Sequence, residues 1–251
     1  MSLTDKTFLI TGAGSGIGAA TAVRAATEGA RVALVGRRPG ALAETAAAIR
    51  RQGGRPALVV TADLTEPSEV DVAASTVLDE FGGLDGLVNN AGIGRFAPIA
   101  DAEAKDLQYM FDLHVRGPVQ LIQWCLPSLR ARSGSIVNVS SVAGDLAAPN
   151  RSFYGATKAA MNHLTRSLAI ELAPEVRVNA ILPGPVDTPI YDRVGMSPET
   201  MRKFRADLEA MTPMGRFGRP DEVAGWVCRL LDDDAAWVTG VLLPIDGGRC
   251  A

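Results

Sequence analysis

The sequence predicts a single doubly wound α/β domain, with a seven-stranded parallel sheet and helices on both faces. Short Val-, Ile- and Leu-rich runs alternate with longer amphipathic patterns, as in sheets that are covered on both sides. A glycine-rich turn, residues 11–18, joins the first apolar run to the first helical pattern. The length of 251 residues suits one large unit, so we expect one domain over residues 1–251.

Each strand of this sheet is expected from one apolar run. In order, the runs are TFLIT (7–11), RVALVG (31–36), PALVVTADL (56–64), LDGLVNNAG (84–92), GSIVNVSS (134–141), VRVNAILPG (176–184) and VLLPIDGG (241–248). Helical patterns lie between them, the longest over 101–129. Such alternation implies right-handed crossovers and parallel strands. A closed eight-stranded barrel also alternates strands and helices, but seven runs and the glycine turn favour the open sheet.

Charge and composition exclude several classes of protein. The formal net charge is −3 and no basic stripe is present, so we expect no nucleic acid or acidic membrane as partner. The three cysteines and two histidines show no ligand spacing, so we expect no metal. The N-terminus lacks the pattern of a secretory signal and no run is long enough to span a membrane, so we expect a cytoplasmic protein.

The glycine turn, TGAGSGIGAA, predicts a dinucleotide site. Gly12, Gly16 and Gly18 allow a tight turn and leave room for a pyrophosphate to approach the backbone. The N–H groups at the start of the next helix then face the negative charge. A glycine cluster alone would also suit a flexible loop, but its place between the first strand and the first helix favours the dinucleotide.

The end of the second strand distinguishes between the two nicotinamide cofactors. An acidic side chain about 20 residues beyond the glycines typically binds the free ribose 2′-hydroxyl of NAD. The sequence VGRRPG instead supplies Arg37 and Arg38, whose guanidinium groups suit the 2′-phosphate of NADP. The sequence therefore favours NADP(H), with NAD(H) as the alternative, although two arginines at a helix entry could also be merely solvated.

Four motifs follow one another in a characteristic order: TGAGSGIG (11–18), NNAG (89–92), NVSS (138–141) and YGATK (154–158). With these motifs, ILPGPVDTP (181–189) and its C-terminal segment, the chain resembles the classical short-chain dehydrogenase/reductase family over essentially its whole length. The resemblance implies a single NAD(P)-binding Rossmann-like oxidoreductase domain. The family's catalytic serine precedes the tyrosine by 13 residues, which selects Ser141 rather than Ser140.

The resemblance also implies the chemistry, a hydride transfer between the cofactor and a carbonyl or secondary alcohol. Ser141 would hold the substrate oxygen and Tyr154 would act as general acid or base. A free tyrosine has a pKa of about 10, and Lys158, on the same helix face at i+4, would lower it. In the family this lysine also binds the nicotinamide ribose. Taken alone, the pair would suit an ordinary helix surface; the ordered motifs favour catalysis.

The remaining cofactor contacts are implied residue by residue. We expect them at Gly12, Ser15, Gly16, Ile17, Gly18, Arg37, Arg38, Asp63, Leu64, Asn90, Ala91, Gly92, Tyr154, Lys158, Pro183, Gly184, Val186 and Thr188. Asp63 and Leu64 resemble the pair beside the adenine, and Thr188 resembles the hydroxyl on the carboxamide. For Asn89 we expect a structural role.

One position departs from the family pattern. The family's fourth catalytic residue is an asparagine on the long central helix, and here His114 stands in its place. In the family this residue helps hold a water that links the lysine to solvent, partly through its backbone carbonyl, which histidine also supplies. The ring, with an ordinary pKa of about 6.5, is a candidate proton conduit. A structural histidine and a disabled relay are the alternatives.

The substrate walls are expected to include the loop 143–152 and the segment 189–215. The second is amphipathic and contains Met196, Met201, Met211 and Met214; it could be a substrate lid or a helix that its methionines pack onto the body. We also expect Arg95, Phe96 and Arg151 to face the opening. The apolar lid weakly favours a hydrophobic carbonyl or alcohol.

Two further expectations concern assembly and the competing function. The resemblance implies a homo-oligomer, typically a homotetramer, formed through two long helices and the C-terminal strand region. A non-catalytic dinucleotide-binding regulator or scaffold on the same fold is the alternative function, since His114 departs from the family pattern.

Overall fold

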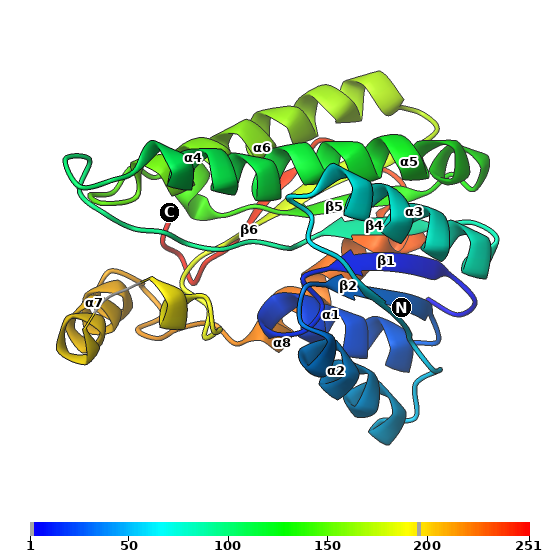
Figure 1. Cartoon of the computed structure of the whole chain (residues 1–251), viewed down its shortest axis with the longest axis horizontal. Helices are drawn as coiled ribbons and strands as arrows, with labels where there is room; N and C mark the ends of the chain where they lie inside the picture. Colours follow the sequence, from blue (N-terminus) through cyan, green and yellow to red (C-terminus); the bar gives the residue numbers. More distant parts are fainter. Residues whose placement is uncertain (1–2, 195–196) are drawn as a thin grey trace.

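The fold is an open parallel sheet of seven strands (Figure 1), and the computed structural model describes residues 3–194 and 197–251. The strand order is β3-β2-β1-β4-β5-β6-β7. The strands are β1 (Thr7–Thr11), β2 (Arg31–Gly36), β3 (Leu58–Thr61), β4 (Gly86–Asn89), β5 (Ser135–Val139), β6 (Arg177–Pro183) and β7 (Leu242–Ile245). The predicted doubly wound sheet is confirmed. The barrel is excluded, because β3 and β7 are unpaired edges.

Helices cover both faces of the sheet. They are α1 (Gly16–Thr27), α2 (Pro39–Arg51), α3 (Pro67–Phe81), α4 (Ala104–Phe111), α5 (Gly117–Ala131), α6 (Ser152–Leu172), α7 (Pro198–Ala210) and α8 (Pro220–Leu231). In Figure 1, α1, α2 and α8 lie on one side of the sheet and α3, α5 and α6 on the other. Each layer has its own apolar core against the sheet, which explains the continuous apolar character of the central strands.

The long helical stretch predicted over 101–129 is not one regular helix. It begins at Ala104, changes to a π-helical turn over Asp112–Arg116, and continues as α5 to Ala131. At the junction the N–H of Gly117 donates to the carbonyl of Asp112, an i→i+5 bond. The turn packs against α6, and its Leu113 lines the cleft described below.

A buried polar chain ties the central strands to α6. The amide of Asn89 donates to Asn138 Oδ1 at 2.9 Å, and the amide of Asn138 donates to Thr165 Oγ1 at 2.9 Å. The three side chains lie on β4, β5 and α6. Because this chain uses the Asn89 side chain, the structural role expected for that residue agrees with the contacts seen.

Candidate active site

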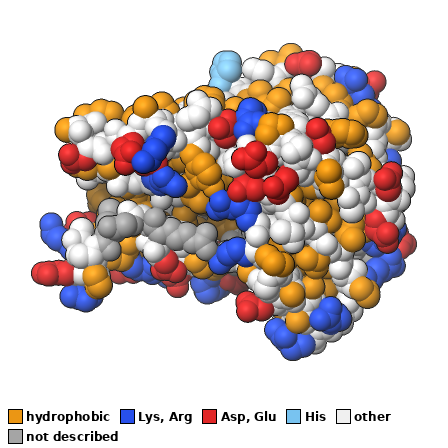
Figure 2. All heavy atoms as spheres, in the orientation of Figure 1, with side chains coloured by type: hydrophobic (Ala, Val, Ile, Leu, Met, Phe, Trp, Pro, Cys, Tyr) orange, Lys and Arg blue, Asp and Glu red, His pale blue; other side chains and the backbone are white. Residues whose placement is uncertain are grey.

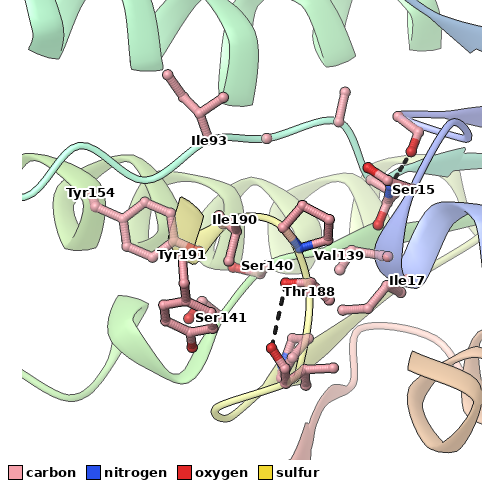
Figure 3. Close-up of a pocket in the computed structure, with 18 of the residues that line it drawn as sticks. Ser15, Ile17, Ile93, Val139, Ser140, Ser141, Tyr154, Thr188, Ile190 and Tyr191 are labelled. Carbon is pink, nitrogen blue, oxygen red and sulfur yellow. Dashed lines mark hydrogen bonds between the residues drawn. The ribbon is translucent and has the colours of Figure 1, made fainter. Parts of the chain in front are cut away.

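A cleft runs along the carboxyl ends of the strands, centred where the strand order reverses between β1 and β4. Figure 2 shows this face of the molecule hollowed beside α7. In Figure 3, Tyr154, Tyr191 and Ser141 lie at one end of the cleft, and Ser15 and Ile17 lie at the other. The cleft is therefore long enough to have two chemically different ends.

The glycine turn forms the Ser15 end. Gly12 has a φ of +64°, which side chains other than glycine rarely adopt. Helix α1 begins at Gly16 with no acidic residue in its first turn, and the Ser15 side chain does not cap it. Its first N–H groups are thus free of a side-chain acceptor, and they form a suitable anion site.

Arg37 and Arg38 line the cleft beside this turn but have different partners. Arg37 pairs with Asp63 at 3.3 Å and also donates to the hydroxyl of Tyr109. Arg38 donates to Ser15 Oγ at 3.1 Å. The charge of Arg37 is therefore partly neutralised within the protein, whereas Arg38 keeps its full charge close to the phosphate end.

Most residues predicted to bind the cofactor line this cleft. They are Gly12, Ser15, Gly16, Ile17, Arg37, Arg38, Leu64, Asn90, Ala91, Gly92, Tyr154, Lys158, Pro183, Gly184, Val186 and Thr188. The lining brings together the ends of the six strands β1 to β6. These side chains are far apart in the sequence, so their convergence is a property of the fold.

Two predicted contacts lie outside the lining. Gly18 is buried in α1, where an added Cβ would lie 2.5 Å from the carbonyl oxygen of Gly12, so its role is close packing of turn and helix. The Asp63 carboxylate accepts hydrogen bonds from Thr65 and Arg37, and these bonds lower its pKa. The cofactor contacts expected at Gly18 and Asp63 stay predictions.

The Tyr154 end holds the predicted catalytic residues. Tyr154 and Lys158 both lie on α6, and Lys158 Nζ is 5.7 Å from the centroid of the tyrosine ring. Lys158 is 5% exposed and donates to the carbonyl of Val139 at 3.0 Å. Ser141 follows β5 and lines the same end of the cleft. The i, i+4 spacing therefore places phenol and amine together, as the sequence predicts.

The pKa of Tyr154 differs in direction from the expectation. Burial raises it, while a hydrogen bond with Ser141 and the positive charge of Arg151 lower it. Burial also lowers the pKa of Lys158 to about 8. Burial, rather than the neighbouring lysine, therefore sets the direction of the pKa shift of Tyr154 in this structure.

His114 lies behind Tyr154 rather than in the cleft lining. Its Nε2 accepts the backbone N–H of Ile93 at 3.1 Å, so Nδ1 carries the proton and donates to Thr157 Oγ1 at 2.8 Å. Its ring stands at 87° to the Tyr154 ring with centroids 5.8 Å apart. Burial and the charge of Lys158 hold the pKa of His114 well below its usual value. The ring is therefore neutral, and a proton conduit through it is not supported.

The carbonyl of His114 has a different environment from its ring. In a regular α-helix this carbonyl would accept the N–H of residue 118, which is Pro118 and has no N–H. The π-helical turn over Asp112–Arg116 lies at the same place. Sequence and local structure thus both interrupt the regular bonding of this carbonyl.

Two further residues lie at the Tyr154 end, Tyr191 of the predicted wall segment 189–215 and Arg249. Burial raises the pKa of Tyr191 to about 12. Arg249 lies four residues beyond β7, and no sequence motif marks it. Of the three residues expected at the opening, Phe96 and Arg151 line the cleft, but Arg95 pairs with Asp106 instead.

The segment 189–215 forms one wall of the cleft through Pro189, Ile190, Tyr191 and Leu208. Helix α7 buries Leu208, whereas Met211 and Met214 just beyond it are 55% and 64% exposed. The alternative that these two methionines pack the helix onto the body is therefore wrong. Met196 lies outside the described residues.

A metal-ligand cluster and a membrane-spanning helix are both absent from residues 3–194 and 197–251. Within those ranges no three His, Cys, Asp or Glu side chains come together as metal ligands. None of the helices described there is both long and apolar enough to cross a lipid bilayer.

The sheet, the glycine turn and the Tyr154–Lys158 pair define a dinucleotide-binding α/β protein. The known proteins that this chain resembles belong to the same class. A family model described as "Enoyl-(Acyl carrier protein) reductase" matches residues 12–249. The chain is 38% identical to 2-(S)-hydroxypropyl-CoM dehydrogenase 3 of Xanthobacter autotrophicus, over 99% of this chain and 98% of that protein. The chain belongs to the short-chain dehydrogenase/reductase family, as its motifs predicted.

Solved structures of the same family show similar folds with both cofactors. The 3-ketoacyl-(acyl-carrier-protein) reductase of Brucella melitensis, complexed with NADH, has a TM-score of 0.90 at 35% identity and covers 100% of each chain. The L-sorbose reductase of Gluconobacter frateurii, complexed with NADPH and L-sorbose, has a TM-score of 0.91 at 32% identity, covering 99% of this chain and 98% of that one. The family thus binds NAD(P)(H), and the protein is an oxidoreductase of that family.

Proposed function

We propose that the protein is an NADP(H)-dependent oxidoreductase that interconverts a carbonyl compound and a secondary alcohol. One observation carries this proposal: Ser141, Tyr154 and Lys158 lie at one end of the cleft whose other end is the glycine turn. A dinucleotide lying along that cleft would reach from the anion site at α1 to the phenol.

The bound nicotinamide would supply or accept the hydride, and the protein would handle the proton. During reduction the hydride adds to the carbonyl carbon, and the Tyr154 hydroxyl gives its proton to the carbonyl oxygen held by Ser141. An alcohol forms and a phenolate remains; oxidation runs in reverse. The raised pKa of Tyr154 keeps the proton on the phenol at neutral pH, before the transfer. The Lys158 ammonium, 5.7 Å from the ring centroid, stabilises the phenolate once it forms.

Lys158 also has donors to offer the cofactor. Its ammonium has three N–H groups, and within the described residues its one hydrogen bond goes to Val139. The other two can donate to ribose hydroxyls. We assign the proton supply to a water at the carbonyl of His114, because Pro118 leaves that carbonyl without its regular partner.

The preference for NADP(H) rests on Arg38 and Ser15. Their hydrogen bond puts a full guanidinium charge and a hydroxyl side by side at the phosphate end. Arg37 contributes less, because Asp63 already holds it.

In this proposal, residues 1–251 act as one domain and the segment 189–215 closes over the substrate. The chain forms a homotetramer. The exposed apolar side chains of Ile170 on α6 and Trp237 before β7 support the last point.

The substitution Tyr154→Phe tests the proposal. It should lower NADPH-dependent reduction at least 1000-fold across a panel of ketones, because phenylalanine has no hydroxyl to donate the proton at this position. NADPH binding, followed by nicotinamide fluorescence, should stay within about threefold, since the ring remains. Wild-type protein that binds NADPH but reduces no ketone and oxidises no alcohol would support the non-catalytic regulator instead.

A further inference from the structure

Two guanidinium groups at the Tyr154 end of the cleft have no acidic partner. Arg151 lies over the rings of Phe96 and Phe204, at 5.3 and 5.0 Å from their centroids. Arg249 Nη1 is buried and makes no hydrogen bond, and Nη2 only approaches the sulfur of Met211 at 3.9 Å. Neither forms an ion pair with any carboxylate of the described part of the chain.

Neighbouring arginines behave differently. Arg205, which also stacks on an aromatic ring near the cleft, pairs with Asp187 at 2.8 Å. The carboxylate nearest to Arg249 in sequence, Asp246, accepts the backbone N–H groups of Gly248 and Cys250 and is not engaged by that guanidinium. At the Tyr154 end, Arg151 and Arg249 therefore differ from their neighbour Arg205 in lacking an acidic partner.

The whole cleft is short of negative charge. Its described lining residues include four arginines and one lysine and no aspartate or glutamate, in a protein of net charge −3. Arg37 and Arg38 account for the positive charge at the Ser15 end. Arg151 is at the opposite end, because Phe96, under Arg151, meets the Tyr154 ring edge-on with centroids 5.6 Å apart. Arg249 is near it, because Arg249 approaches Met211 just beyond α7 and Arg151 covers Phe204 of that helix.

Holding two such groups together is unfavourable without a ligand. The buried Nη1 of Arg249 loses hydration that no hydrogen bond of the described residues replaces. Burial and the charge of Arg249 lower the pKa of Arg151. An anion placed between them would replace the lost hydration and offset the repulsion, and planar oxyanions match the guanidinium donors.

We propose that the substrate is a ketone or secondary alcohol that carries an anionic group, a carboxylate, sulfonate or phosphate, bound by Arg249 and Arg151. This inference rests on the proposed function, because it assumes that the reacting oxygen lies between Ser141 and Tyr154. It replaces the weak expectation of a purely hydrophobic substrate. Arg249 is the better residue to substitute, because a change at Arg151 would also alter the pKa of Tyr154.

The test compares keto acids with their neutral esters. The probes are 3-oxobutanoate, 4-oxopentanoate and 5-oxohexanoate and their methyl esters, reduced with NADPH. For the best of the three pairs, wild-type kcat/KM should favour the acid at least 10-fold. Arg249→Gln should lower kcat/KM for that acid by about 10- to 100-fold, mainly through KM, as expected for one lost charged hydrogen bond. The ester should change less than about threefold.

Arg50→Gln is the matched control. Arg50 is an exposed cation on α2 outside the cleft lining, so its loss should change neither substrate. Esters reduced as well as acids by the wild type would overturn the inference, as would equal losses for acid and ester in Arg249→Gln.

A second measurement does not depend on turnover. Pentanoate and pentanamide are titrated calorimetrically into the protein, with and without NADP⁺. Pentanoate should bind more tightly, and Arg249→Gln should abolish the difference; equal binding of the two would overturn the inference. If no ketone is reduced at all, the proposed function fails, while this titration still decides whether the anion site exists.

Discussion

The imidazole of His114 is held at both nitrogens, by the backbone of Ile93 and by the hydroxyl of Thr157. Thr157 in turn donates to the carbonyl of Tyr154, so the histidine braces the turn of α6 that carries the phenol. A neutral, doubly bonded ring can position a neighbour but does not exchange protons readily. Compared with the asparagine of the family pattern, His114 supplies the same backbone carbonyl but a different supporting side chain.

We expect His114→Asn to cost stability more than activity. Asparagine can replace only part of this bonding and leaves a void, so the free energy of unfolding at pH 7.5 should fall by about 1–3 kcal/mol. Turnover should stay within about tenfold, because the carbonyl remains. Urea unfolding and steady-state kinetics measure the two effects, and loss of most turnover would contradict this role.

The destabilisation caused by His114→Asn should also depend on pH. The folded protein leaves His114 neutral, whereas the unfolded chain binds a proton below pH 6.5, so wild-type stability is lost as the pH falls through that value. At pH 5 the destabilisation caused by His114→Asn should be smaller by about 2 kcal/mol than at pH 7.5. His163→Asn, at an exposed histidine on α6, is the control and should show no such change.

At the scale of elements, the first βαβ unit decides between the cofactors. The turn after β2 presents Arg37 and Arg38 together, but the two differ once β3 is in place, because Asp63 follows that strand and pairs with Arg37. Only tertiary pairing of β2 with β3 brings that carboxylate into range.

We expect Arg38→Gln to raise KM for NADPH about 10- to 100-fold and to leave KM for NADH nearly unchanged. The reason is that, in the proposed complex, Arg38 and Ser15 would contact the 2′-phosphate, which only NADP carries. Arg37→Gln should have a smaller effect, because Asp63 and Tyr109 already hold that guanidinium. Equal losses for both cofactors in Arg38→Gln would argue against a 2′-phosphate site.

At the scale of the whole molecule, the exposed apolar side chains suggest where copies meet. Ile170 on α6 is 84% exposed and Trp237 is 100% exposed. They lie on the long-helix surface and near the C-terminal strand, the two regions expected to form a tetramer.

Charged substitutions at these positions test the assembly. Ile170→Glu and Trp237→Glu should each yield dimers, and the double variant monomers, by analytical ultracentrifugation, because each removes one of two independent contacts. Val72→Glu, at an exposed valine on α3 outside both surfaces, is the control and should leave the tetramer intact. A wild-type monomer would refute the proposed assembly directly.

The sequence alone determined the features that depend on local spacing. Apolar runs and helical periods gave seven parallel strands, and β1 and β2 have the predicted bounds. The glycine turn and the Tyr154–Lys158 pair were also predicted, because a turn and an i, i+4 contact are set by residues close together in the chain.

Only the tertiary structure decided what depends on distant partners. The bonding of His114, the pairing of Arg37 with Asp63 and the meeting of Arg151 with Arg249 all join separate segments of the fold. The raised pKa of Tyr154 belongs with them, because burial is produced by the packed molecule and not by neighbours in sequence. Charge, burial and hydrogen bonding act through space, so they become fixed only when the strands and helices are assembled.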